Sequence, residues 1–241
     1  MDVDWETGAT IRVLIFVGVF MLIAVFGAAF AESSGAAEST AEPGAAAILM
    51  TFLVTHMMPV IIMLGACARM VPPGERGVAW QTDGLVPNMP GQAFLRALFL
   101  ALAVTAIQFG WGSALEAVFN YAPDDPTSEI LGKGNREVIA AIIFGAVILA
   151  PIAEEMFFRR VLHRALWRRL GETQADVITA AAFSLAHFSI LSFPGLFFFG
   201  YVQQRILRRF GSLSLVILVH AIYNAIVVGW MVQNGAGSAA Q

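Results

Sequence analysis

Long apolar stretches run through most of the chain. Most of them are long enough to cross about 30 Å of hydrocarbon as a helix, and they lack the polar–apolar alternation of membrane-barrel strands. A shorter apolar stretch at 194–202 continues into Gln203, Gln204 and Arg205, which indicates a further helix that is partly buried in protein. The pattern predicts an all-α fold, a polytopic transmembrane helical bundle of about seven spans. The six longer stretches are 11–31, 45–67, 93–119, 138–153, 177–193 and 213–232.

The composition agrees with a membrane protein. Hydrophobic residues make up 58% of the 241 residues and charged residues only 13%, with a mean hydropathy of +0.74, whereas soluble domains carry roughly 25% charged residues. The single cysteine, Cys67, excludes an intrachain disulfide and a Cys-rich zinc site. The net charge of −3 gives no indication of a nucleic-acid partner.

Arginines are distributed unevenly over the predicted loops, and cytoplasmic loops usually carry the excess of cations. Segment 32–44 has no Lys or Arg, and segment 120–136 has only Lys133 and Arg136. Seven alternating spans place the arginine-rich loops on one face, which predicts an integral protein of the cell membrane with a cytoplasmic N-terminus and an external C-terminus. The arginines of these loops are Arg69, Arg76, Arg96, Arg159, Arg160, Arg164, Arg168, Arg169, Arg205, Arg208 and Arg209.

The first apolar stretch has two interpretations. Ala29-Phe30-Ala31 before Glu32 is similar to a signal-peptidase site. However, the residues before the stretch are acidic, and the stretch is long for the apolar region of a signal peptide. We therefore favour a retained first span at 11–31.

Two adjacent glutamates, Glu154 and Glu155, stand at the end of the fourth apolar stretch. An ionised carboxylate in hydrocarbon is costly, so intramembrane acids usually face a cavity and usually have a function. Arg159 follows Glu155 by four residues, the favourable order for an ion pair within a helix. Glu154 lies about 100° round the helix from Glu155, so the two carboxylates cannot face one partner. A structural charge cluster at the interface explains the following arginines but not two adjacent acids.

Two histidines lie inside later apolar stretches. His187 follows Phe183 by one turn, and Asn224 follows His220 by one turn, so each pair shares a helix face. Each histidine alone is more simply explained by hydrogen bonding between helices. Together with Glu154, Glu155 and Arg159, they provide a base, two imidazoles, a cation and an amide. That set is suited to the attack of water on a carbonyl.

Three ordered motifs, Glu154-Glu155-x-x-x-Arg159, Phe183-x-x-x-His187 and His220-x-x-x-Asn224, resemble those of the CPBP intramembrane proteases. That family includes CAAX-processing (Ras-converting) endopeptidases and bacterial members linked to peptide maturation and bacteriocin immunity. The resemblance implies a catalytic core at 137–234, after variable helices at 1–136 and before a short tail at 235–241.

The resemblance also implies a catalytic role for each motif residue. Glu154 would be the general base, and His187 would complete the water site. Glu155 and Arg159 would hold the site in shape, and His220 and Asn224 would stabilise the oxyanion.

The expected activity is that of an endopeptidase acting on a protein or peptide substrate tethered to the lipid bilayer. A proton-coupled transporter and a non-catalytic peptide-binding membrane protein are the alternatives. The cofactor is either none or one divalent metal, with Glu154, His187 and His220 as a candidate zinc set. Because the sequence has no H-E-x-x-H motif, we favour water activation without a metal.

Overall fold

The computed structural model describes residues 44–58, 91–119, 136–187 and 192–238, together with positions 60, 61, 65, 130, 131 and 189. The predicted span at 11–31 and most of the arginine-flanked loop after residue 67 lie outside these residues. All elements within the described ranges are helical, as predicted. They are α2 (Ala45–Phe52), η2 (Leu53–Met57), α5 (Gly91–Phe119), α7 (Arg136–Phe144), η3 (Gly145–Leu149), α8 (Ala150–Glu155), η4 (Met156–Leu162), α9 (His163–Leu170), α10 (Glu172–Leu185), α11 (Phe193–Phe210) and α12 (Leu213–Ser238).

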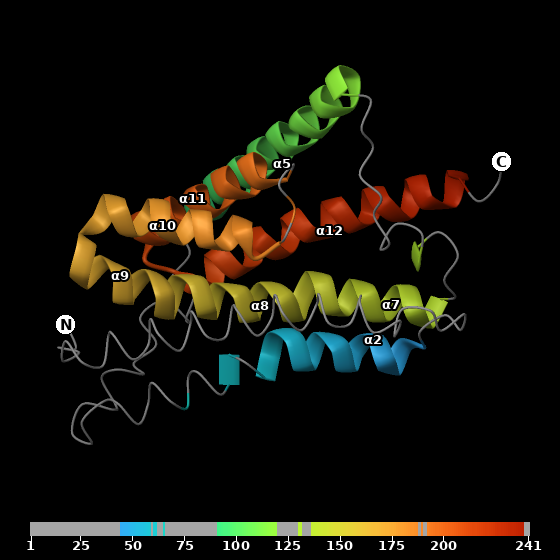
Figure 1. Ribbon diagram of the computed structural model, residues 1–241, viewed down its shortest axis with the longest axis horizontal. Helices are drawn as coiled ribbons and strands as arrows, with labels where there is room; N and C mark the ends of the chain where they lie inside the picture. The colour runs from blue at the N-terminus through green and yellow to red at the C-terminus, as the bar shows by residue number, and fades with distance from the viewer. Residues whose placement is uncertain are drawn as a thin grey trace.

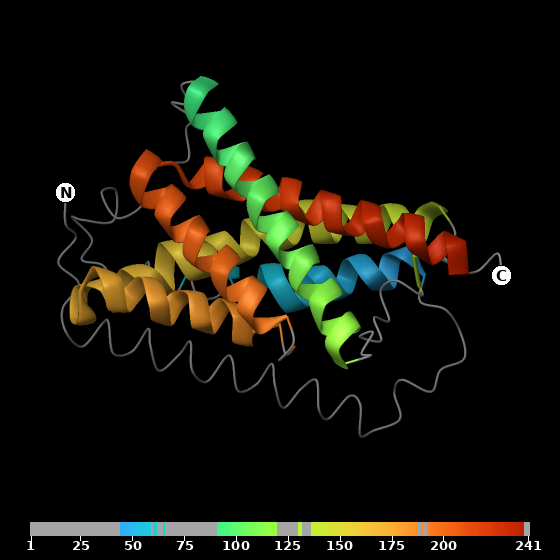
Figure 2. The same ribbon diagram turned by 90° about the horizontal axis from the view of Figure 1, so that it is seen from above.

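One long helix runs through the bundle. Figure 1 shows α7, α8 and α9 running on as a single rod, with α2 along one side and α12 along the other. The chain turns at Gly171, whose φ of 82° favours glycine, and α10 then packs against α9 and α11. Seen from above, α5 crosses α12 and runs alongside α11 (Figure 2), and it contacts both. These contacts leave the centre of the long helix enclosed by α2, α10, α11 and α12.

Among the residues that the structure describes, three helical segments are long and apolar enough to cross a membrane: Leu98–Phe119, Arg136–Trp167 and Leu213–Gln233. Helix Ala45–Met57 is apolar but shorter. The predicted count of about seven spans is thus not confirmed by the described residues. The stretch at 177–193 is not one continuous helix, because α10 ends at Leu185 and α11 begins at Phe193.

The predicted partly buried helix at 194–202 is confirmed as part of α11. Its polar residues Gln203 and Gln204 are both buried, and Gln203 Nε2 donates a hydrogen bond to the Val216 carbonyl of α12 at 3.1 Å. An amide buried in an apolar bundle needs such a partner, so Gln203 ties α11 to α12.

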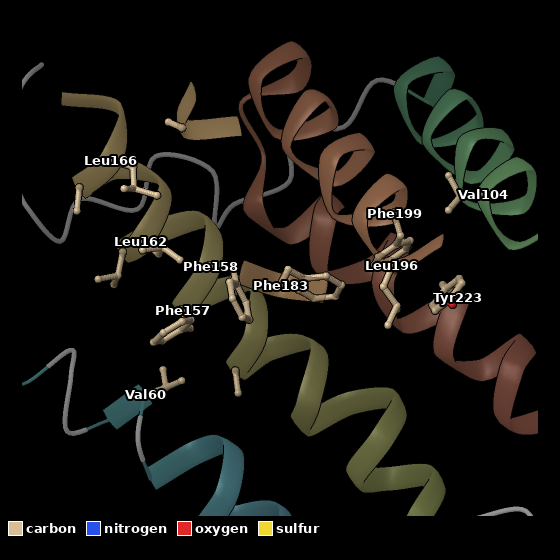
Figure 3. Packing of buried hydrophobic residues seen from close by; sticks show 14 residues of the cluster. Val60, Val104, Phe157, Phe158, Leu162, Leu166, Phe183, Leu196, Phe199 and Tyr223 are labelled. Carbon is tan, nitrogen blue, oxygen red and sulfur yellow. The ribbon is translucent and has the colours of Figure 1, made fainter. Parts of the chain in front are cut away.

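Phe183 lies at the centre of the largest hydrophobic cluster and is fully buried (Figure 3). Its ring contacts Phe158 of the long helix and Phe199 of α11, with ring centroids 5.2 Å and 5.9 Å apart. Gly200 allows this approach, because a Cβ at that position would lie 3.2 Å from the Phe183 ring. The cluster brings the Glu154 helix, α10 and α11 together around one aromatic side chain.

Candidate active site

The two glutamates lie between two π-helical segments. Segment η3 ends just before α8, which carries both acids, and η4 follows it directly. Pro151 in the first turn of α8 explains the first π segment, because proline has no N–H and its ring crowds the carbonyl four residues earlier. Single π turns inside α-helices occur frequently at functional sites.

Asn224 satisfies a carbonyl that this distortion leaves free. The Ala150 N–H bonds to the Gly145 carbonyl, five residues back. The corresponding donor for the Ala146 carbonyl would be Pro151, which has none. Asn224 Nδ2 donates to that Ala146 oxygen at 2.7 Å, so one N–H of this predicted site residue joins α12 to the long helix.

Glu155 is fully buried and has two charged or polar partners. Arg159 Nε lies 3.0 Å from its Oε2, and His220 Nδ1 lies 2.8 Å from its Oε1. The predicted ion pair between residues 155 and 159 is therefore present. Sequence reasoning placed Arg159 among the loop arginines, but the structure buries it inside the candidate span Arg136–Trp167, since its partner Glu155 is buried there.

The Arg159 guanidinium is held by charge and by aromatic contact. Its Cζ lies 5.1 Å from the ring centroid of Phe183, within the range of a cation–π interaction. Within the described ranges, none of its three side-chain nitrogens has a hydrogen-bond partner of good geometry. The 3.0 Å contact with Glu155 is thus an ion pair without an aligned hydrogen bond.

Glu154 points away from that pair and lies between two imidazoles. Its Oε2 is 3.8 Å from His220 Nε2, and its Oε1 is 3.8 Å from His56 Nε2. Both distances exceed that of a hydrogen bond, and Oε2 has no hydrogen-bond partner among the residues that the structure describes. Glu154 therefore differs from Glu155, whose carboxylate has both an ion pair and a hydrogen bond.

His56 was missed by the sequence analysis. It lies in η2, within the apolar helix Ala45–Met57, and its Nε2 is 3.8 Å from Glu154 Oε1. The signal that could have identified it is the one used for His187, a single histidine in an apolar stretch. The structure shows that α2 and η2, before the motif region, supply a side chain to the site.

His187 lies just beyond the end of α10 and is exposed. Its Nδ1 is 2.8 Å from the Phe183 carbonyl, and its ring lies 4.8 Å from the Phe183 ring. The His220 ring contacts the same phenylalanine at 5.9 Å. Phe183 therefore contacts both predicted histidines.

The hydrogen bonds place a proton on Nδ1 of three imidazoles. In His220 and His187, Nδ1–H donates to the Glu155 carboxylate and to the Phe183 carbonyl, respectively. In His56, Nδ1–H donates to Thr55 Oγ1, whose own hydroxyl donates to the Thr51 carbonyl. Each ring therefore leaves Nε2 with a free lone pair.

The candidate zinc set does not form a ligand cluster. In the part of the chain that the structure describes, no three His, Cys, Asp or Glu side chains lie close enough together to hold a metal ion. Glu154 and His220 are adjacent, but His187 does not join them as a third ligand. The residues present thus do not fit the candidate zinc set.

The burial of the Glu155–Arg159 pair predicts a large difference between two variants. Arg159→Ala leaves a buried carboxylate without its cation, and we expect it to lower the free energy of unfolding by about 3–5 kcal/mol. Glu154→Gln should stay close to wild type, because Glu154 has no close ion pair. Chemical denaturation in detergent micelles measures both, and an equal loss in the two variants would contradict this division.

Comparison with protein families identifies the region that carries the site. Residues 136–226 match the model of the Rce1-like family, described as type II CAAX prenyl endopeptidase Rce1-like. No curated protein and no solved structure matches the chain. The matched segment begins with α7 and ends two residues after Asn224, so it contains all three motifs. Residues 136–226 therefore form a domain of the Rce1-like family, the protease family that the three motifs resemble.

Proposed function

We propose that this chain is an intramembrane endopeptidase in which Glu154 activates water for attack on a peptide bond. The observation that carries the proposal is the position of its carboxylate, 3.8 Å from the Nε2 atoms of both His56 and His220, at the end of an apolar helix. The Glu154 carboxylate takes a proton from water, and the free lone pairs of the imidazoles orient that water. Protein substrates and membrane association follow from the protease family.

His220 stabilises the oxyanion in this proposal. Its Nδ1–H is held by Glu155, which also pairs with Arg159. When Glu154 passes to His220 Nε2 the proton that it took from water, both ring nitrogens become donors, and the Glu155 carboxylate balances the new charge. Nε2–H can then donate to the tetrahedral oxyanion, and the second N–H of Asn224 supplies a further donor.

The substrate class is a prenylated or otherwise membrane-tethered protein, cleaved close to its lipid anchor. This choice follows from the family's description as prenyl endopeptidases and from the position of Glu154 inside a candidate span. A scissile bond must reach that depth, and a lipid anchor on the substrate holds it there at high effective concentration.

Removal of the general base should abolish cleavage without unfolding the protein. We expect Glu154→Gln to lower kcat by a factor of about 10²–10⁴, because the amide keeps the shape of the side chain but cannot accept a proton. The assay is hydrolysis of a fluorogenic prenylated peptide by the full chain in liposomes. Glu116→Gln, on an exposed position of α5, is the matched control and should keep wild-type kcat. Wild-type activity of Glu154→Gln would refute the mechanism.

Chelation tests the proposed independence from metal. Water activation by Glu154 and imidazoles requires no ion, so dialysis against a strong chelator should leave the hydrolysis rate unchanged. The same samples are analysed for bound metal by mass spectrometry. Stoichiometric zinc that is lost together with activity, and restores activity when added back, would contradict the proposal.

For the orientation, we propose that the arginine-rich ends of η4, α9 and α11 are cytoplasmic and that Ser238 is external. Helix α12 starts beside Arg208 and Arg209 and runs away from them to Ser238 (Figure 1), which supports opposite sides for these groups. In a Cys67→Ser background, Ser238→Cys should react with a membrane-impermeant maleimide from outside, and Gly74→Cys only after permeabilisation. Labelling of Ser238→Cys only from the cytoplasm would reverse the orientation.

A further inference from the structure

A cavity of about 410 Å³ lies beside the candidate active site. Four arginines line it, Arg159, Arg160, Arg164 and Arg208, together with Trp167 and Gln204. Arg159 lies between the cavity and the candidate active site, because it lines the cavity and also pairs with Glu155. None of the three motifs accounts for the other lining residues.

The carboxylates near the cavity already have partners. Asp176 pairs with Arg208 and accepts a hydrogen bond from His163 Nε2 at 2.9 Å, and Glu172 also pairs with Arg208. Glu155 pairs with Arg159, and Glu172 and Asp176 both pair with Arg208. In the described part of the chain, no carboxylate pairs with Arg164, which is exposed. The cavity thus has at least one arginine that is available to an anion.

The cavity lies at the level where two candidate spans end. Trp167 is the last residue of the span Arg136–Trp167, and Leu213, which also lines the cavity, is the first residue of Leu213–Gln233. Trp167 is about half exposed, and tryptophan side chains gather at the headgroup level of membranes. A ligand in this cavity therefore lies among lipid headgroups.

Buried polar groups in the wall give a second indication of a ligand. Gln204 is 1% exposed, and its Oε1 has no hydrogen-bond partner among the residues described. Arg159 also lines the cavity and pairs with Glu155, but its three guanidinium nitrogens have no hydrogen-bond partner among the residues described. Buried polar groups usually have partners, so this wall matches a ligand with both an anionic acceptor and a hydroxyl donor.

We propose that this cavity binds the headgroup of an anionic phospholipid, with the phosphate between Arg164, Arg160 and Arg208 and a headgroup hydroxyl toward Gln204. Basic pockets between helices at the cytoplasmic surface commonly bind anionic lipid headgroups. The proposal does not depend on the proposed protease mechanism. It predicts that the chain prefers lipids with a net negative charge over zwitterionic lipids of the same chain length.

The test measures binding of short-chain phosphatidylglycerol and short-chain phosphatidylcholine to the full chain in neutral detergent, by native mass spectrometry. We expect phosphatidylglycerol to bind more tightly. Arg164→Gln should weaken that binding about fivefold, the usual effect of one cation near an anionic lipid surface, whereas Arg164→Lys should keep most of the affinity. Equal binding of the two lipids, or an Arg164→Gln variant that binds like wild type, would overturn the proposal.

Two control variants separate a built site from general attraction to negative charge. Arg136 is exposed at the opposite end of the same long helix, and Arg205 is exposed on α11 outside the cavity. Arg136→Gln and Arg205→Gln should both leave phosphatidylglycerol affinity unchanged. A loss as large as that of Arg164→Gln would indicate diffuse electrostatics and overturn the site.

Competition identifies the source of the anion. Inorganic phosphate at millimolar concentration should displace little bound phosphatidylglycerol, because it lacks the headgroup hydroxyl and the acyl chains. Inorganic phosphate that binds as tightly as the lipid would reassign the cavity to a free anion. Displacement of the lipid by a peptide with a free C-terminal carboxylate, but not by its amide, would reassign it to a peptide and likewise overturn the lipid proposal.

Discussion

The ion pair between Glu155 and Arg159 is the interaction on which the rest of the site depends. Both side chains are fully buried in an apolar bundle, where an unpaired charge would cost several kcal/mol. The pair therefore depends on the side chains that pack against it. Phe183 covers the guanidinium, and His220 donates to the second oxygen of Glu155. Through these contacts one buried charge pair determines where α10 and α12 sit against the long helix.

The distortion of the long helix at Pro151 affects both the contact with α12 and the surroundings of the two glutamates. Pro151 removes one backbone donor just before the glutamates, and Asn224 replaces that donor from α12. Asn224 therefore joins α12 to the long helix and also lies near the site. The neighbouring Glu154 is left without a close partner, between two imidazoles. The same segment thus combines an acid that has an ion pair and a hydrogen bond with an acid whose Oε2 has no hydrogen-bond partner among the described residues.

Polar residues on one face of the long helix extend from the candidate active site to the arginine cavity. Glu155, Arg159 and His163 follow at intervals of four residues, so their side chains stack along that face. The line continues through Asp176 of α10 to Arg208 of α11. Arg159 takes part in both the candidate active site and the arginine cavity, since it pairs with Glu155 and lines the cavity. A ligand that orders the arginine cavity would therefore also hold the positioning residue of the site.

The sequence by itself determined the helical class, the Glu155–Arg159 pair and the buried character of Gln203 and Gln204, because each depends on spacing or polarity within one segment. The resemblance in three short motifs was enough to identify the family of residues 136–226. Only the tertiary structure decided that His56 lies beside Glu154, that Asn224 bonds to Ala146, and that Arg159 is buried rather than in a loop. These features depend on how separate helices pack, and the apolar pattern of a membrane helix does not reveal which of its faces meets a neighbour. For the same reason the sequence overestimated the length of the helix predicted at 177–193, which ends at Leu185, before His187.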